Sequence, residues 1–155
     1  MARNELLRSM CDALEMDDAT TIKVFNYAGR PVGLSTVTAL KLSEDQENYI
    51  PCSDPVLGFF LDGLIIHFRG QREGKLSPAD NPSAALTNNA ILKKLRIALD
   101  LKEDDLIGIL KLAGIDVSKH ELTALFRKPG HKHYKECNDT FLKDFLKGIS
   151  LRRKA

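Results

Sequence analysis

The 155-residue sequence has no tryptophan, only three cysteines and only 6% aromatic residues. Cys11, Cys52 and Cys137 are an odd number of thiols, far apart, with no Cys-x-x-Cys pair among them. This pattern argues against a disulfide scaffold and against a zinc ribbon. We therefore expect three reduced cysteines that serve as small buried packing residues.

Long apolar runs are also absent. The longest, residues 56–68, is interrupted by Gly58, Asp62, Gly63 and His67 and falls short of the roughly 20 residues that span a bilayer. The first residues turn amphipathic at once, without the basic region, apolar core and cleavage site of a secretory signal. We expect a cytoplasmic protein that makes no contact with a membrane.

Residue patterns for catalysis are missing as well. The glycines fall singly, so there is no glycine-rich phosphate loop. The acidic runs 17–18 and 103–105 stand at expected helix starts, where the helix dipole favours negative charge. A cysteine nucleophile would need a nearby base, and only Cys137 has histidines close by in the sequence. We therefore predict no catalytic residue, no cofactor and no enzymatic activity.

The sequence does contain an internal repeat. Residues 4–69 align with residues 89–154 without a gap, and 18 of the 66 aligned positions are identical. Most of the identical residues are apolar, glycine or helix-cap residues. At such positions the fold, and not the function, limits which residues are accepted. Between the copies, the sequence is rich in glycine, proline, serine and asparagine. We predict a first module over residues 1–70, a polar linker over 71–87 and a second module over 88–155.

Each copy has the pattern of four helices. In the second copy, we expect Asn89 to cap the first helix, Gly114 to end the second, and Ser118 to open the third with a capping box. Asp139, like Asp54 before Pro55 in the first copy, is expected to cap the fourth. No stretch alternates as a strand does. The predicted fold is all-α, a tandem duplication of a four-helix module packed as a compact two-lobed helical protein.

The segments 88–99, 112–118, 52–54 and 60–65 resemble those of the YehS-like family, bacterial proteins built from a duplicated helical domain of unknown function. The first copy departs from the pattern where Arg3-Asn4 replaces paired asparagines and where residues 33–37 lack the capping box. The resemblance covers nearly the whole chain. It implies an architecture, but neither a mechanism nor a catalytic residue.

The strongest candidates for metal ligands are His131, His133 and Cys137, with His120 and Asp139 nearby. The duplication weakens this hypothesis, because the first copy has Ser35, Gln46 and Asn48 in place of the three histidines. Only the cysteine and the aspartate recur. We therefore favour a structural role for Cys137 and predict no metal site.

The two copies differ most in charge. Residues 4–70 hold 5 lysines and arginines against 10 acidic residues, a net charge of −5, and residues 89–155 hold 15 against 9, a net charge of +6. The contrast is sharpest where the acidic segment 43–48 aligns with the basic segment 128–133. The two modules therefore either attract each other, within or between chains, or use the basic module for a separate partner.

Nucleic acid is one candidate partner, since clustered cations are the electrostatic footprint of phosphate binding. The residues predicted to make these contacts are Lys128, Lys132, Lys135, Arg152 and Arg153. The second and third helices of the second copy meet at Gly114 in the manner of a helix-turn-helix, although the connecting turn is longer than usual.

Protein contact is the other candidate and the one that the sequence favours. A module of about 66 residues buries a limited core and commonly packs on another unit. The helix 56–68 carries too many apolar residues for one stripe. We predict that Phe59, Ile65, Ile66 and Phe68 face the second copy or another chain, with Gly63 and Gly148 allowing close helix contact. Protein contact or self-association thus ranks first, nucleic-acid binding second and a metal-dependent enzyme a distant third.

Overall fold

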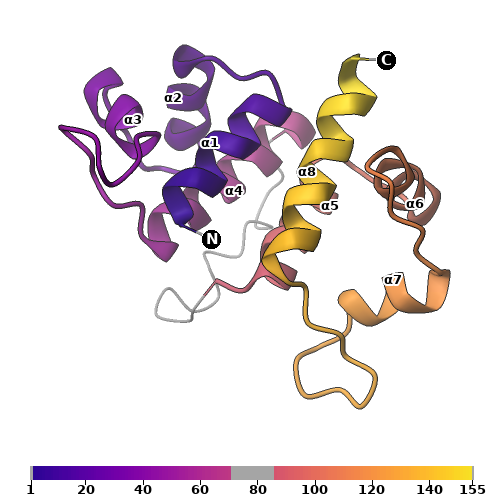
Figure 1. The fold of residues 1–155 in the computed structure, drawn as a ribbon. Coiled ribbons are helices and arrows are strands. Elements are labelled where there is room, and N and C mark those ends of the chain that lie inside the picture. Colours follow the sequence, from indigo (N-terminus) through magenta and orange to yellow (C-terminus); the bar gives the residue numbers. More distant parts are fainter. Residues whose placement is uncertain (1, 71–85, 155) are drawn as a thin grey trace.

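The computed structural model describes residues 2–70 and 86–154, and these residues form eight α-helices and no strand. Figure 1 shows the first four helices on one side of the molecule and the last four on the other. The helices are α1 (Arg3–Ala13), α2 (Asp18–Tyr27), α3 (Leu34–Leu40), α4 (Asp54–Arg69), α5 (Asn88–Ala98), α6 (Glu103–Leu112), α7 (Lys119–Leu125) and α8 (Asp139–Lys154). The prediction of a duplicated four-helix module is confirmed. None of the described helices has the length and apolar character needed to cross a membrane.

Several helix ends lie where the sequence placed them. Gly29 and Gly114 follow α2 and α6 with φ of 76° and 85°, a left-handed conformation that favours glycine and stops a helix. The Ser118 hydroxyl oxygen accepts a hydrogen bond from the Glu121 backbone N–H and caps α7. In the first module, Gly33 stands at the start of α3 and offers no side-chain cap.

The predicted caps of the other helices were wrong by one or two residues. Thr87, not Asn89, caps α5 through a hydrogen bond from the Ala90 N–H. Ser53 caps α4, and Asn138 accepts from the Phe141 N–H at the start of α8. Asp54 and Asp139, which we predicted as caps, are instead the first residues of their helices.

In the first module, α4 packs closely against α2, and in the second module, α8 packs closely against α6. The rings of Phe25 and Phe60 lie 5.6 Å apart, centroid to centroid, across the α2–α4 contact. A Cβ atom added at Gly63 would lie 1.9 Å from the Val24 carbonyl oxygen, and one at Gly148 would lie 2.2 Å from that of Ile109. Both glycines thus permit a close helix approach, but their partners are helices of the same module and not the second copy.

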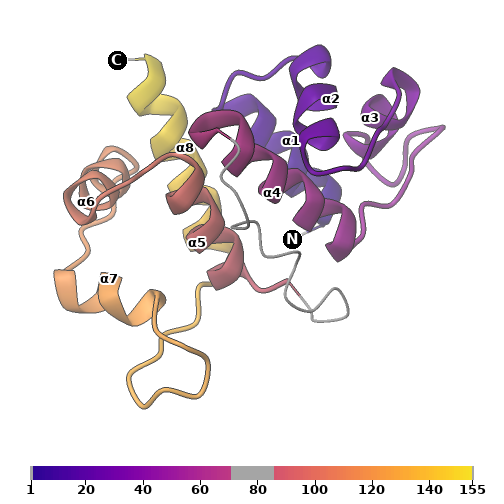
Figure 2. The ribbon, with the colours of Figure 1, turned by 180° about the vertical axis from the view of Figure 1, so that it is seen from behind.

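Two helices of each module also form the boundary between the modules. α4 packs against α5, and α1 packs against α8, so the first and fourth helices of one copy meet the fourth and first helices of the other. Figure 1 shows the α1–α8 side of this contact, and Figure 2 shows α4 beside α5 from behind. The buried apolar side chains of both modules belong to one continuous core. The modules are therefore two halves of one packed unit.

Most of the predicted linker, residues 71–85, lies outside the described residues. Leu86, where the description resumes, is fixed to the first module. Its N–H donates to the Asp54 carboxylate over 3.0 Å, and its carbonyl oxygen accepts from the Arg3 guanidinium. The N–H of Leu86 first, and the Arg3 guanidinium after it, lower the pKa of the Asp54 carboxyl.

Candidate functional site

The predicted interface residues lie largely at the boundary between the modules. Asp62 and Arg69 of α4 reach the second module, and Ile65 and Ile66 stand between them, within one turn of each. Ile65 is half-buried, and Ile66 is 6% exposed. The apolar surplus of α4 is therefore covered by α5 of the same chain, on the face that holds these residues.

The other two predicted interface residues are less buried: Phe59 contacts a residue of its own module, and Phe68 borders the second module. Phe59 is half-buried, with the Arg30 guanidinium 5.6 Å from its ring centroid. Phe68 keeps 37% of its surface exposed and packs edge-on against His67 with ring centroids 4.9 Å apart. Phe68 is thus a partly exposed aromatic residue at the end of α4.

Ion pairs join the modules across the same boundary. Asp62 of α4 pairs with Lys94 of α5, and both side chains are mostly hidden from water. Glu5 of α1 lies 3.0 Å from Lys143 of α8 at a more exposed position. Each pair takes its acid from the acidic module and its cation from the basic one. Arg69 and Asp100, 2.8 Å apart, form a third pair with the opposite polarity.

The basic loop, residues 127–136, connects α7 to α8 and projects from the lower end of the second module in Figure 1. Lys128, Lys132 and Lys135 are all exposed on it. Lys135 lies 3.5 Å from the Glu121 carboxylate, whereas Lys128 and Lys132 form no ion pair within the described part of the chain. The structure therefore brings together three of the five cations predicted to bind nucleic acid.

The other two predicted cations lie at the opposite end of the second module. Arg152 and Arg153 are exposed near the C-terminal end of α8, which Figure 1 places far from the basic loop. Arg152 lies 3.4 Å from Asp105. Arg153 lines a surface hollow at the module boundary together with Phe68 and Arg69. The five predicted cations thus form two separate groups.

A stripe of exposed cations follows α8 from its first turns to its C-terminal end. Lys143, Lys147 and Lys154 are exposed and recur at spacings of four and seven residues, which places them along one face of the helix. Sequence reasoning counted these residues in the net charge but did not assign them to a surface. Their spacing of four and seven residues in the sequence is the signal that could have placed them on one face of the helix.

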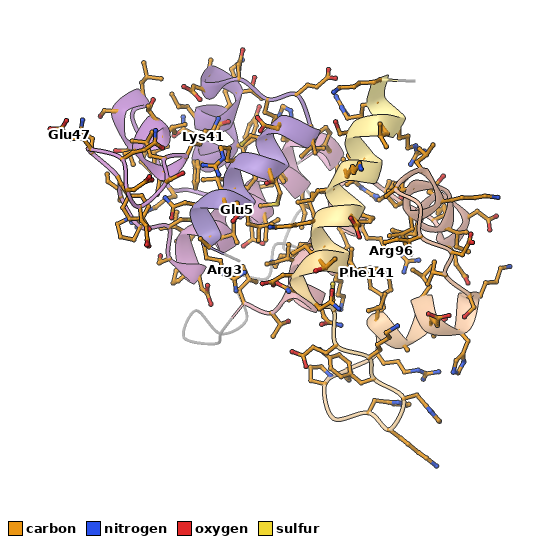
Figure 3. All side chains as sticks on the ribbon, in the orientation of Figure 1. Arg3, Glu5, Lys41, Glu47, Arg96 and Phe141 are labelled. Atoms are coloured by element: carbon orange, nitrogen blue, oxygen red, sulfur yellow. The ribbon has the colours of Figure 1, made fainter. Side chains whose placement is uncertain are left out.

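The first module has acidic residues where the second has the basic loop. Glu44, Asp45 and Glu47 are exposed in the segment between α3 and α4. Figure 3 shows Glu47, which occupies the position of Lys132, at the outer edge of the first module. The same part of the fold therefore carries opposite charge in the two modules.

The candidate metal ligands do not form a ligand set. The rings of His131 and His133 lie 5.9 Å apart, and His120 lies 6.3 Å from His133. The His131 Nδ1 already accepts a hydrogen bond from the backbone N–H of His133. Across residues 2–70 and 86–154, no three histidine, cysteine or acidic side chains are arranged to hold a metal ion.

Cys137 and Cys52 are buried in the two modules at equivalent positions. Burial raises the pKa of the Cys137 thiol to about 11 and that of Cys52 to about 12. A thiol with such a pKa is protonated at neutral pH and is a poor nucleophile and metal ligand. These thiols therefore have the environment of packing residues.

Sequence reasoning missed the role of the repeated asparagines. The Asn89 side chain donates to the carbonyl oxygens of Leu125 and Lys135 and accepts from the Cys137 N–H, over 2.8–2.9 Å. Asn4 makes the same three bonds in the first module. Each buried asparagine ties the first helix to the end of the third and to the loop before the fourth. This loop is the segment that carries the acidic or basic residues.

Comparison with known proteins finds the same duplication. A family model described as "Protein of unknown function (DUF1456)" matches the chain twice, over residues 3–70 and 88–154. The chain is 37% identical over 153 residues to the "Uncharacterized protein YehS" of Escherichia coli (strain K12), covering 99% of this chain and 97% of that protein. No solved structure matches significantly.

Proposed function

The chain belongs to the family of proteins of unknown function DUF1456, and we propose that it is a non-enzymatic binding protein whose basic second module contacts nucleic acid. The acidic first module stabilises the second by pairing with it. The phosphate contacts come from Lys128 and Lys132 of the basic loop, with Lys135 beside them.

Because the modules pair with each other, nucleic-acid binding ranks above protein contact, which reverses the order that the sequence suggested. Protein contact ranked first because α4 had surplus apolar residues and because the two halves had opposite charge. Both features find their partners inside the chain, through the packing of α4 on α5 and the pair of Asp62 with Lys94. Lys128 and Lys132 of the basic loop, in contrast, have no ion-pair partner within the described part of the chain.

The observation that supports the proposal best is that Lys128 and Lys132 are exposed and form no ion pair with the residues that the structure describes. Exposed cations keep a layer of water and exchange it readily for phosphate oxygens, and each phosphate neutralised releases counterions from the nucleic acid. The exposed lysines of α8 add further positive charge to the same module. The acidic first module repels the phosphates and directs them to the second.

The connection between α6 and α7 favours contact with the phosphate backbone over reading of base sequence. Six residues separate Leu112 from Lys119, whereas a helix-turn-helix has a turn of three or four residues. α7 has only seven residues, which is short for a helix that enters the major groove. We therefore expect little dependence on base sequence.

Binding to a labelled DNA duplex tests this proposal through fluorescence anisotropy at several salt concentrations. The dissociation constant is expected to rise steeply with salt. In a plot of log Kd against the logarithm of the salt concentration, the slope is expected to be about 0.9 for each phosphate contact. The variant with Lys128→Glu, Lys132→Glu and Lys135→Glu is expected to bind at least tenfold more weakly and to lose about three units of slope. Lys23→Glu and Lys111→Glu, on exposed residues elsewhere, serve as controls. No binding of the unchanged protein at low salt contradicts the proposal.

A specific observation also favours a second function, protein contact through the first module. Leu34 is 60% exposed and Ile50 is 42% exposed, at positions where the second module has Lys119 and Lys135. Exposed apolar residues at the α3 end of the module suit a protein partner. Capture from a cell lysate is expected to recover such a partner, and Leu34→Lys with Ile50→Lys is expected to abolish its recovery.

A further inference from the structure

The second module has a pocket on the surface of its described residues. The pocket lies between the end of α5, the start of α6 and α7, and is lined by Arg96, Glu103, Leu122, Thr123, Phe126 and Arg127. Its volume is about 220 Å³, below the roughly 300–1,000 Å³ of sites for drug-sized ligands. It therefore suits a molecule of about amino-acid size. Figure 3 shows Arg96 among the helices of the second module.

Two arginines bring hydrogen-bond donors to this pocket that lack acceptors. The Arg127 Nε–H is buried and has no hydrogen-bond partner within the described residues. An unpaired buried donor costs about 1–3 kcal/mol, so native proteins usually supply an acceptor. The Arg96 guanidinium stacks 4.7 Å from the Phe126 ring centroid and uses its Nε to bond the Leu101 carbonyl oxygen. Its two terminal nitrogens make no hydrogen bond within the described residues.

The same pocket also offers acceptors and an apolar wall. Glu103 is half-buried and forms no ion pair with either arginine in the described part of the chain. The Thr123 hydroxyl donates its proton to the Lys119 carbonyl oxygen over 2.8 Å, which leaves its lone pairs free to accept. Leu122 is 2% exposed and, with the Phe126 ring, provides apolar surface.

In the corresponding region of the first module, a cation and a carboxylate meet directly. Lys41 occupies the position of Phe126, and its Nζ lies 2.8 Å from the carboxylate of Asp18, which occupies the position of Glu103. Leu42 and Cys11 stand where the second module has Arg127 and Arg96. One direct ion pair thus satisfies this region in the first module. In the second, the carboxylate and the two guanidinium groups remain apart.

We propose that this pocket binds a small zwitterion of the amino-acid type. The ligand carboxylate accepts hydrogen bonds from the terminal guanidinium nitrogens of Arg96 and Arg127, the ammonium donates to Glu103 and Thr123, and the ligand side chain packs against Phe126. A plain carboxylate would leave Glu103 unpaired, and a plain amine would leave the arginines unpaired. A zwitterion satisfies both, and this proposal does not depend on nucleic-acid binding.

Nuclear magnetic resonance of the full ¹⁵N-labelled chain tests the proposal, because the Arg127 Nε–H gives its own signal. Three probes of similar shape are titrated: L-leucine, 4-methylpentanoate without the ammonium, and 3-methylbutylamine without the carboxylate. L-leucine is expected to shift the Arg127 and Thr123 signals in a saturable manner at millimolar concentrations. The two analogues are expected to bind at least tenfold more weakly.

Two variants that introduce the corresponding residue of the first module show whether the ligand binds in the pocket or at another surface. Phe126→Lys supplies the cation that pairs with Glu103, and Arg127→Leu removes the unpaired donor, so each is expected to abolish the shifts. Arg30→Leu, an exposed arginine of the first module, is expected to leave them unchanged. The backbone spectrum shows whether each variant is folded. If a variant is unfolded, the comparison of the three probes on the unchanged protein still tests whether the pocket recognises a zwitterion.

Three outcomes would overturn the proposal. If none of the probes shifts the Arg127 signal, water alone occupies the pocket. Equal binding of L-leucine and 4-methylpentanoate would show that the ammonium is not recognised. Saturable binding that persists in folded Phe126→Lys and Arg127→Leu would place the ligand at another surface.

Discussion

Asn4 and Asn89 are the polar residues on which the internal order of each module depends most. Each makes three hydrogen bonds inside the protein and is at most 8% exposed. Their identity between the copies was visible in the sequence, but a helix cap was the simpler interpretation. Asparagine is common at caps, and the carbonyl oxygens that Asn89 bonds lie 36 and 46 residues away. Local patterns do not predict such distant partners.

Asn89→Ala is expected to lower the free energy of unfolding by about 2–4 kcal/mol, because it leaves a buried N–H and two carbonyl oxygens without partners. Asn4→Ala is expected to have an effect of similar size. Urea denaturation followed by circular dichroism measures both. Asn26→Ala, on an exposed residue of α2, is the control and is expected to change stability by less than about 0.5 kcal/mol.

The cysteine thiols are expected to react slowly with a soluble disulfide reagent at pH 8, since burial raises the pKa of Cys137 to about 11, that of Cys52 to about 12 and that of Cys11 above its usual value. Only the thiolate reacts quickly. Urea is expected to speed the reaction of all three. Fast reaction of the folded protein would contradict their assignment as packing residues.

The same pKa shifts predict a loss of stability at high pH. A thiol whose folded pKa is raised contributes its full stability below the unfolded value of about 8.5, and this contribution falls as the pH rises toward the folded value. The free energy of unfolding is therefore expected to decrease above about pH 9. Replacing Cys52 and Cys137 by alanine is expected to reduce this decrease, which urea titrations at several pH values measure.

Helix periodicity and end signals predicted the elements well, because each helix has a local pattern of apolar residues and stop signals. α7, for example, begins directly after Ser118, whose hydroxyl oxygen caps it by accepting the Glu121 N–H. The partners of the helices were harder to predict. Gly63 and Gly148 indicated close contacts, but periodicity shows only that a face is buried and not which helix covers it. The sequence also did not predict that the candidate cations form two groups, which lie apart because the length of α8 separates the basic loop from Arg152.

Gly63→Ala and Gly148→Ala are expected to lower the free energy of unfolding by about 2–3 kcal/mol, because the new methyl group would overlap a carbonyl oxygen of α2 or α6. Gly108→Ala is the matched control. A Cβ atom there meets nothing within 4 Å, so alanine is expected to stabilise α6 by about 0.5–1 kcal/mol. Thermal unfolding of the three variants shows the contrast, and equal effects at all three positions would contradict the close helix contacts.

Across the whole molecule, the opposite charges of the modules are used partly at the boundary that joins them. From the sequence, attraction between the modules, within or between chains, was one of two alternatives, and the other was a separate partner for the basic module. Neither the pairing of α4 with α5 nor that of Asp62 with Lys94 is apparent from the repeat, because both depend on how the halves are placed. The outer charges, such as the basic loop and its acidic counterpart, have no part in this contact.

Asp62→Lys is expected to lower the free energy of unfolding by about 3 kcal/mol, because it places two ammonium groups together where little water reaches them. Adding Lys94→Asp to this variant restores a pair of opposite sign and is expected to recover at least half of the loss. Lys143→Glu, at the exposed pair with Glu5, is expected to cost less than about 1 kcal/mol. Failure of the exchanged pair to recover stability would contradict the boundary described here.

The molar mass in solution tests most directly whether the modules pair within one chain. Light scattering over a wide range of protein concentrations is expected to give a constant mass of 17.3 kDa, because the apolar faces of α4 and α5 cover each other. A mass that rises with concentration toward twice this value, and falls again with Asp62→Lys, would show that the same faces pair between chains and would contradict the account.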